Sequence, residues 1–132
     1  MSDRDAHLEQ ARLNRRIAEE MLQRAIDTGD NVYCQWAVTA AFYCSVHCIE
    51  AHLDTVGLHS QHHGDRDTKM GRHCPTHVYT AHNALRDFSH EARYLIATFS
   101  PTWVRMVVLN KYLSQVTRFA HLDQVRDSGT PS

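Results

Sequence analysis

Residues 31–56, NVYCQWAVTAAFYCSVHCIEAHLDTV, decide the fold of this 132-residue chain. Apolar side chains recur there at helical spacing, so we expect one long helix that is apolar around much of its circumference. Its bulky positions are Phe42, Ile49, Leu53 and Val56, and its small positions are Ala37, Ala41, Cys44, Cys48 and Ala51. Such a helix belongs at the centre of a domain. The small side chains allow another backbone to come close, either within the bundle or across a dimer axis.

The segment before this stretch predicts a helix over residues 3–27. Ser2 and Asp5 resemble a capping box at its start, and an apolar stripe follows. The stripe consists of Leu13, Ile17, Met21 and Ala25, joined by Ala18 and Leu22. Gly29 suits the position after this helix, and Asp30 suits the N-cap of the next one.

Residues 57–74, GLHSQHHGDRDTKMGRHC, lack a helical period and contain three of the five glycines. They predict a long connection, of a length that is often functional or mobile. The following helix, over residues 75–99, carries the clearest periodicity in the chain, with an apolar residue every three or four positions. These positions are Val78, Ala81, Leu85, Phe88, Ala92, Leu95 and Phe99.

Ser100 and Pro101 are typical of the N-cap and the first residue of a last helix, which we expect to reach about residue 122. Its inward positions are Trp103, Val107, Tyr112, Leu113, Val116 and Phe119. The pattern therefore predicts an all-α, four-helix up-down bundle with a long loop between the second and third helices. Residues 1–124 form one domain, and residues 125–132 are expected to be a disordered tail.

The charge balance favours neither a basic nor an acidic partner surface, because 14 Lys and Arg face 15 Asp and Glu. No apolar run reaches the roughly 18 residues of a membrane span, and no signal peptide precedes the first helix. We therefore expect a cytoplasmic protein that does not enter a membrane. Its four cysteines are expected to be reduced thiols, and no cofactor is expected.

Histidine is the unusual component, with eleven residues, seven of which lie between residues 59 and 90. The pairs His59 with His63 and Cys74 with His77 have spacings that metal ligands use. One alternative is thus a metal-binding protein that uses the loop 59–77, and the other is a solvated loop. A di-iron site is not expected, because none of the five glutamates has a histidine three residues later.

Three helical positions carry polar groups that invite two interpretations. His47 lies on the central helix, where an imidazole either contacts a ligand or forms a core hydrogen bond. Arg93, beside Tyr94, and Arg86 on the same helix either contact a phosphate or pair with an acid of a neighbouring helix.

Two segments resemble a known family. Residues 36–63, WAVTAAFYCSVHCIEAHLDTVGLHSQHH, are similar to a helix of the HEPN (higher eukaryotes and prokaryotes nucleotide-binding) superfamily. That helix carries an Ala-x-x-x-Tyr-Tyr-x-x-x-His-like pattern before a loop that contains histidine. Residues 79–95, YTAHNALRDFSHEARYL, resemble the Tyr…Leu…Ser-x-x-x-Arg-Tyr segment of compact HEPN-like proteins. The resemblance covers residues 30–96 in detail and the outer helices by length and order.

The resemblance implies a helical bundle that commonly dimerises, and whose relatives often act as ribonucleases in toxin–antitoxin or defence systems. Active members carry Arg-x(4–6)-His, in which arginine holds the phosphate and histidine moves a proton. The candidate pairs here are Arg72 with His77, Arg66 with His73, and Arg86 with His90. The last pair has only three intervening residues, which places both side chains on one helix face. Composition alone gives about three such spacings by chance, so spacing does not select a pair.

The favoured hypothesis is a dimeric, HEPN-like module that binds RNA, a nucleotide or an antitoxin partner. The expected ligand-binding residues are His47, Arg66, Arg93 and Tyr94. The alternatives are a metal-independent endoribonuclease, using Arg86 and His90 or Arg72 and His77, and the metal-binding protein described above.

Overall fold

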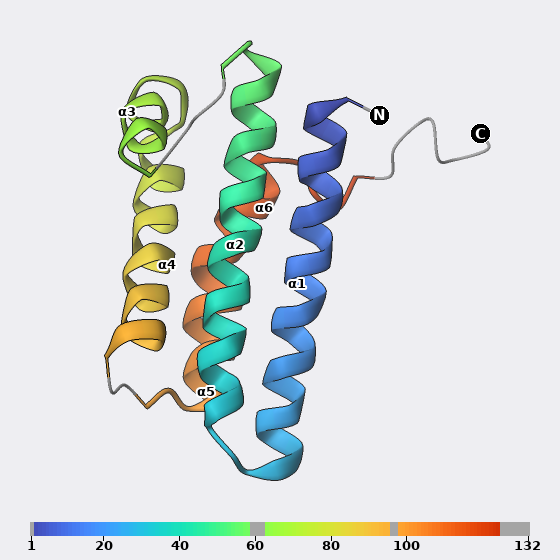
Figure 1. Cartoon of the computed structure of the whole chain (residues 1–132), viewed down its shortest axis with the longest axis vertical. Helices are drawn as coiled ribbons and strands as arrows, with labels where there is room; N and C mark the ends of the chain where they lie inside the picture. Colours follow the sequence, from blue (N-terminus) through green and yellow to red (C-terminus); the bar gives the residue numbers. More distant parts are fainter. Residues whose placement is uncertain (1, 59–62, 96–97, 125–132) are drawn as a thin grey trace, which may run out of the picture.

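The computed structural model describes residues 2–58, 63–95 and 98–124, and these residues contain helices and no strand. Two long helices come first, α1 (Asp3–Thr28) and α2 (Val32–Thr55). They are followed by α3 (His63–His73) and α4 (Thr76–Tyr94). A C-terminal helical segment consists of α5 (Pro101–Trp103), the π-helix η1 (Val104–Leu113) and α6 (Ser114–Phe119). Figure 1 shows α1, α2, α4 and this segment side by side, with α3 beyond the start of α4.

Helix α2 is central, as its sequence predicts. It contacts α1, α3, α4, η1 and α6, and its bulky residues Phe42, Ile49 and Leu53 are fully buried. The fourth expected bulky position, Val56, is wrong, because it lies at the C-cap and is 48% exposed. The whole small stripe is buried as well, and the thiols of Cys44 and Cys48 lie near Arg15 of α1. The close approach that these small residues allow is therefore used inside the protomer, between α1 and α2, and the stripe offers no surface for a second copy.

Helix α1 begins and ends where its sequence indicates. The Ser2 hydroxyl accepts a hydrogen bond from the amide of Asp5 at 3.1 Å, and Gly29 closes the helix in the left-handed region at φ 72°. The expected apolar stripe is wrong in part, because Leu13 and Ile17 are 38% and 36% exposed. The stripe that packs against the core consists of Leu8, Ala11, Ala18, Leu22 and Ala25. The expected N-cap of α2 is wrong by one residue, because Asn31 occupies that position and its side chain forms no capping bond. The Asp30 carboxylate, one residue earlier, still accepts from the amide of Val32 at 3.0 Å.

The expectation of an irregular connection over residues 57–74 is wrong for residues 63–73, which form α3. This helix has a single fully buried apolar side chain, Met70, and its other anchors are charged. Arg66 pairs with Glu50 of α2 at 2.7 Å, and Asp67 pairs with Arg86 of α4. Because those partners lie 16 and 19 residues away in sequence, local periodicity contains no sign of the helix.

The third expected helix ends earlier than its pattern suggests. α4 stops at Tyr94, and Leu95 is extended and exposed. Phe99 is buried by stacking on Trp103, with 5.2 Å between ring centroids, so it packs on the core from outside the helix. Ser100 caps the C-terminal segment as expected, since its hydroxyl accepts from the amide of Trp103 at 3.2 Å.

The C-terminal segment differs from the expected α-helix because its middle is a π-helix, with hydrogen bonds from i to i+5. The wider turn changes which residues share a face. Val104, Val108 and Leu109 are buried, whereas Val107, an expected inward residue, is only partly buried. Leu113 and Val116 are buried as predicted. The expected tail, residues 125–132, lies outside the described residues.

Candidate ligand site

An open pocket lies where the first half of α2 meets the last turn of α4. Its volume is about 420 Å³, and its lining residues are Gln35, Trp36, Thr39, Ala92, Arg93 and Tyr94. Trp36 is 59% exposed and Tyr94 is 68% exposed, which is unusual for aromatic side chains of this size. We call this feature the Trp36–Tyr94 pocket.

Arg93 is the charged group of the pocket, and aromatic rings surround it. Its Nη1 donates to the hydroxyl of Tyr43 at 2.9 Å, and its Nε donates to the carbonyl of Ser89 at 3.3 Å. The guanidinium carbon lies 5.7 Å from the ring centroid of Tyr43 and 5.2 Å from that of Tyr94. These contacts fix the plane of the guanidinium, since cation–π attraction and two hydrogen bonds restrain it together.

No carboxylate of the described residues forms an ion pair with Arg93. A guanidinium has five N–H donors, of which the two contacts above use two. The others remain for an anion, and the exposed rings of Trp36 and Tyr94 offer flat apolar surfaces beside it. The arrangement suits a ligand that combines a planar ring with a negative charge.

Of the residues that the sequence nominates, Arg93 and Tyr94 are brought together in this pocket, and His90 lies beside them. The His90 ring is exposed, with its centroid 5.0 Å from that of Tyr94. Arg86, the proposed catalytic partner of His90, forms a hydrogen-bonded ion pair with Asp67 of α3. Its charge is thus directed toward α3, which is the pairing with a neighbouring helix that the sequence left open.

The other nominated basic residues lie apart from this pocket. Arg72 and His77 are both exposed, one at the end of α3 and the other in the first turn of α4. His73, the partner of Arg66 in the second spacing match, is also exposed, and its carbonyl accepts from His52. Arg66 is 11% exposed, and its guanidinium is committed to Glu50.

His47 forms a contact that its sequence context does not reveal. Its Nδ1 lies 3.0 Å from Nδ1 of His7 on α1, so one imidazole donates and the other accepts. Burial lowers the pKa of His47, and the nearby His7 imidazole lowers it further. This half-buried pair fits the core interpretation of His47 better than a ligand contact, because its ring nitrogen is already engaged.

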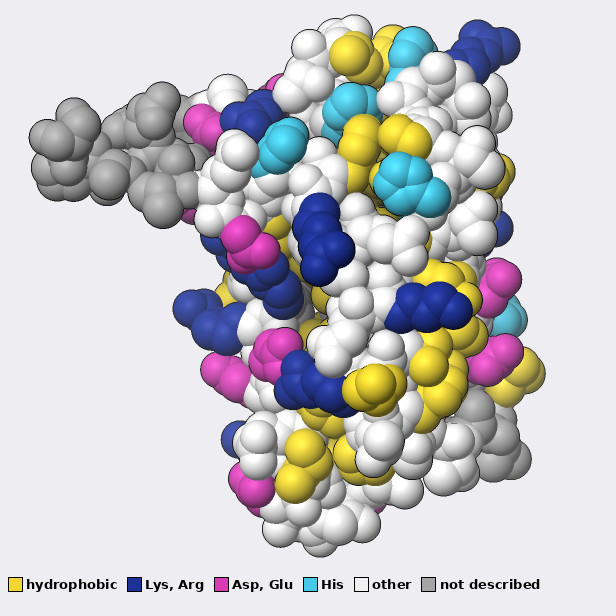
Figure 2. Space-filling view, turned by 180° about the vertical axis from the view of Figure 1, so that it is seen from behind, with side chains coloured by type: hydrophobic (Ala, Val, Ile, Leu, Met, Phe, Trp, Pro, Cys, Tyr) yellow, Lys and Arg dark blue, Asp and Glu magenta, His cyan; other side chains and the backbone are white. Residues whose placement is uncertain are grey.

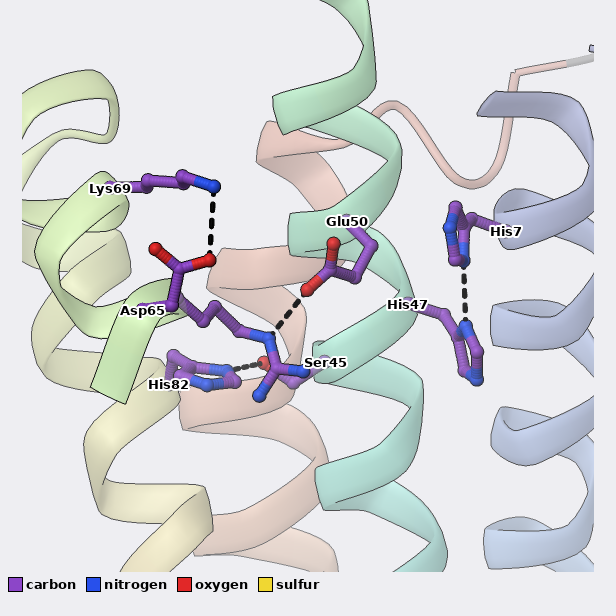
Figure 3. A network of polar contacts seen from close by, with 8 residues as sticks. His7, Ser45, His47, Glu50, Asp65, Lys69 and His82 are labelled. Carbon is purple, nitrogen blue, oxygen red and sulfur yellow. Dashed lines mark hydrogen bonds and ion pairs between the residues drawn. The ribbon is translucent and has the colours of Figure 1, made fainter. Parts of the chain in front are cut away.

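A buried polar contact that the sequence analysis does not predict lies on the opposite side of α2. The Ser45 hydroxyl and Nδ1 of His82 are 2.7 Å apart, and both residues are buried. Figure 3 shows this contact, the ion pair that reaches Glu50 and the pair formed by Asp65 and Lys69 on one side of α2, with His7 and His47 on the other. Because both partners are buried, this hydrogen bond satisfies polar groups of the core. Its only sequence signal is a polar residue at a helix position that the apolar neighbours predict to be inside.

The metal hypothesis names four candidate ligands, His59, His63, Cys74 and His77. His59 lies outside the described residues, and so does the side chain of His63. Among the described side chains no group of three or more His, Cys, Asp or Glu could hold a metal ion. Burial raises the pKa of the Cys74 thiol to about 11, which disfavours the thiolate that a metal would bind.

No family model matches this sequence, and no curated protein matches it. Over residues 2–58, 63–95 and 98–124, no helix combines the length and apolar character that crossing a membrane requires.

Proposed function

We propose that this protein is a HEPN-like helical-bundle module that binds single-stranded RNA or a nucleotide through the Trp36–Tyr94 pocket. One observation carries the proposal. Arg93 lacks a carboxylate partner among the described residues, and it lies against Tyr43 and Tyr94 beside an open pocket with an exposed tryptophan. Bases stack on exposed aromatic rings and on guanidinium planes, and arginine donors bind phosphate oxygens.

The surface charge supports a local contact rather than a long electrostatic track. Figure 2 shows Lys and Arg side chains interspersed with Asp, Glu and apolar ones over the rear face. With a net charge of −1, the protein lacks the general attraction that draws basic domains to nucleic acid. Affinity for RNA would therefore come mainly from stacking in the pocket, with a weak salt dependence.

The proposal includes the architecture and the setting that the HEPN resemblance implies. We treat α1, α2, α4 and the C-terminal segment as an up-down four-helix bundle, with α3 as an accessory helix and residues 1–124 as the domain. We propose a cytoplasmic homodimer that also accepts an antitoxin partner. Light scattering tests the dimer, and a mass of one chain at micromolar concentration would contradict it.

The binding proposal is tested by titrating the protein with a single-stranded oligouridylate and with a mononucleotide while tryptophan fluorescence is recorded. We expect quenching, since Trp36 is exposed whereas Trp103 stacks on Phe99. Arg93→Ala should weaken binding at least tenfold, because it removes both the charge and a stacking plane. Arg16→Ala is the matched control, an exposed arginine on α1. Equal affinities for wild type and Arg93→Ala would refute the proposed site.

Endoribonuclease activity remains the second candidate, because exposed His90 lies beside the pocket. It predicts cleavage of single-stranded RNA in EDTA, and loss of cleavage in the Arg86→Ala/His90→Ala or the Arg72→Ala/His77→Ala double variant. Cleavage that persists in both double variants would exclude these pairs.

A further inference from the structure

A second pocket, separate from the Trp36–Tyr94 pocket, lies at the other end of α2. It has a volume of about 280 Å³ and is lined by Arg4 of α1, by Ala51, His52 and Thr55 of α2, and by Phe119 and His121 of the C-terminal segment. Three residues with basic side chains, from three separate elements, thus line one pocket together with apolar residues. Figure 2 shows histidine side chains gathered toward this upper end of the rear face, beside apolar ones.

His121 has a left-handed backbone conformation, which glycine adopts more readily than histidine. Helix α6 ends in a Schellman motif, in which the amide of Leu122 donates to the carbonyl of Thr117 and the amide of His121 donates to that of Arg118. His121 therefore occupies the position where glycine is most common, and its φ is 56°. It is the only non-glycine residue of the described chain with a positive φ. The turn itself does not need an imidazole, which here is held at the rim of a pocket despite the backbone cost.

His52 is held in place from two sides. Its Nε2 donates to the carbonyl of His73 at 3.0 Å, and its ring centroid lies 4.5 Å from that of Phe119. Donation from Nε2 leaves Nδ1 as the second hydrogen-bonding atom of the ring. The imidazole is thus oriented before any ligand arrives, which lowers the entropic cost of binding.

Arg4 supplies the permanent charge of this pocket. Among the residues that the structure describes, it forms an ion pair with Asp5, at 3.6 Å, and both side chains are substantially exposed. An ion pair of this length and exposure is weak and is readily exchanged for a better anion. A phosphate group, with three oxygens to accept hydrogen bonds, matches one guanidinium and two imidazoles better than a single carboxylate does.

We propose that the pocket formed by Arg4, His52 and His121 binds the phosphate of a small organic phosphomonoester, whose organic part lies on the Phe119 and Ala51 floor. The inference does not rest on the proposed RNA or nucleotide function, because the two pockets share no residue.

Isothermal titration calorimetry with phenyl phosphate and with inorganic phosphate, at pH 6 and low salt, tests this site. Phenyl phosphate should bind more tightly than inorganic phosphate, because only the ester contacts the apolar floor. Arg4→Gln should weaken binding at least tenfold, whereas Arg24→Gln, an exposed arginine at the other end of α1, should not change it.

His121→Gly separates a ligand role from a structural one. Glycine accepts the positive φ, so the melting temperature should stay the same or rise, while phenyl phosphate binding falls at least tenfold. Wild-type affinity in both Arg4→Gln and His121→Gly would overturn the proposal, and so would an equal loss in Arg24→Gln. Arg93→Ala should leave this binding unchanged, so that failure here and failure of the RNA or nucleotide site are distinguished.

Discussion

The docking of α3 onto α2 offers the sharpest test of how this fold is held together. Arg66 of α3 and Glu50 of α2 are 11% and 10% exposed, and their charged groups are 2.7 Å apart. Glu50→Gln keeps the shape of the side chain and one acceptor oxygen, but it removes the charge that Arg66 faces. We expect α3 to be weakened before the rest of the bundle, since its few contacts are mainly with α2 and α4.

The expected loss in the free energy of unfolding depends on how deeply the ion pair is buried. Breaking a fully buried ion pair by removing one partner costs about 3–5 kcal/mol, because the other charge is left without compensation. Both groups here keep some contact with water, so we expect about 2–3 kcal/mol for Glu50→Gln. The loss cannot exceed the free energy that docks α3, to which burial of the Met70 side chain adds roughly 1.5–3 kcal/mol.

Two measurements check this expectation. Urea denaturation of wild type, Glu50→Gln, Arg66→Met and the double variant gives the coupling energy of the pair, expected to be about 1–3 kcal/mol. Native-state hydrogen exchange should show faster exchange of α3 amides in Glu50→Gln, with little change in the middle of α2. Lys69→Met is the control, because Lys69 and Asp65 form a more exposed pair within α3, worth about 0.3–0.5 kcal/mol.

A coupling energy below about 0.5 kcal/mol would refute the argument, since it would place this pair with ordinary surface contacts. Unchanged exchange of α3 amides would refute it equally, because the helix would then be anchored by something other than the charges described.

Four further predictions follow from single side chains. Burial lowers the pKa of His47, so its imidazole is protonated less readily in the folded state than in the unfolded state. The free energy of unfolding should therefore fall as pH drops below about 6.5, and it should fall less in His47→Gln. Urea titrations at pH 7.5 and at pH 5 measure this difference. With its pKa raised to about 11, the Cys74 thiol should react with iodoacetamide at pH 8 on the order of 100-fold more slowly than a free cysteine, measured by mass spectrometry. His121→Gly should stabilise the protein by about 1 kcal/mol in urea denaturation, because αL backbone strain is relieved. Ser45→Ala should cost about 1–3 kcal/mol in the same assay, since it removes the hydroxyl 2.7 Å from Nδ1 of His82.

Sequence reasoning succeeds here where structure depends on neighbours along the chain. The bounds of α1 and α2, the Gly29 terminus and the Ser100 cap all rest on local signals, and all are present. The central place of α2 also follows from its own composition. The sequence does not predict helix α3, because the helix is stabilised by ion pairs with Glu50 and Arg86 on other helices. The hydrophobic periodicity of residues 63–73 carries no sign of these distant partners.

The candidate pocket was predicted only in part, for a related reason. Arg93 and Tyr94 stood out as an arginine beside an aromatic residue on a helix face. Trp36 and Tyr43 belong to another helix, and only the packing of α2 against α4 brings them together. Arg86 shows the opposite case. Its i, i+4 spacing places it on the same helix as His90, but its ion-pair partner is Asp67 of α3, which the spacing does not reveal.

The tight packing of α1 on α2 gives the cysteines of this protein a chemical meaning. Cys34, Cys44 and Cys48 are fully buried in α2. A reagent or an oxidant can reach them only when the helices separate, whereas Cys74 is only partly buried. The order in which the four thiols are modified would therefore record the order in which the molecule opens, so the native sequence contains its own probe of unfolding.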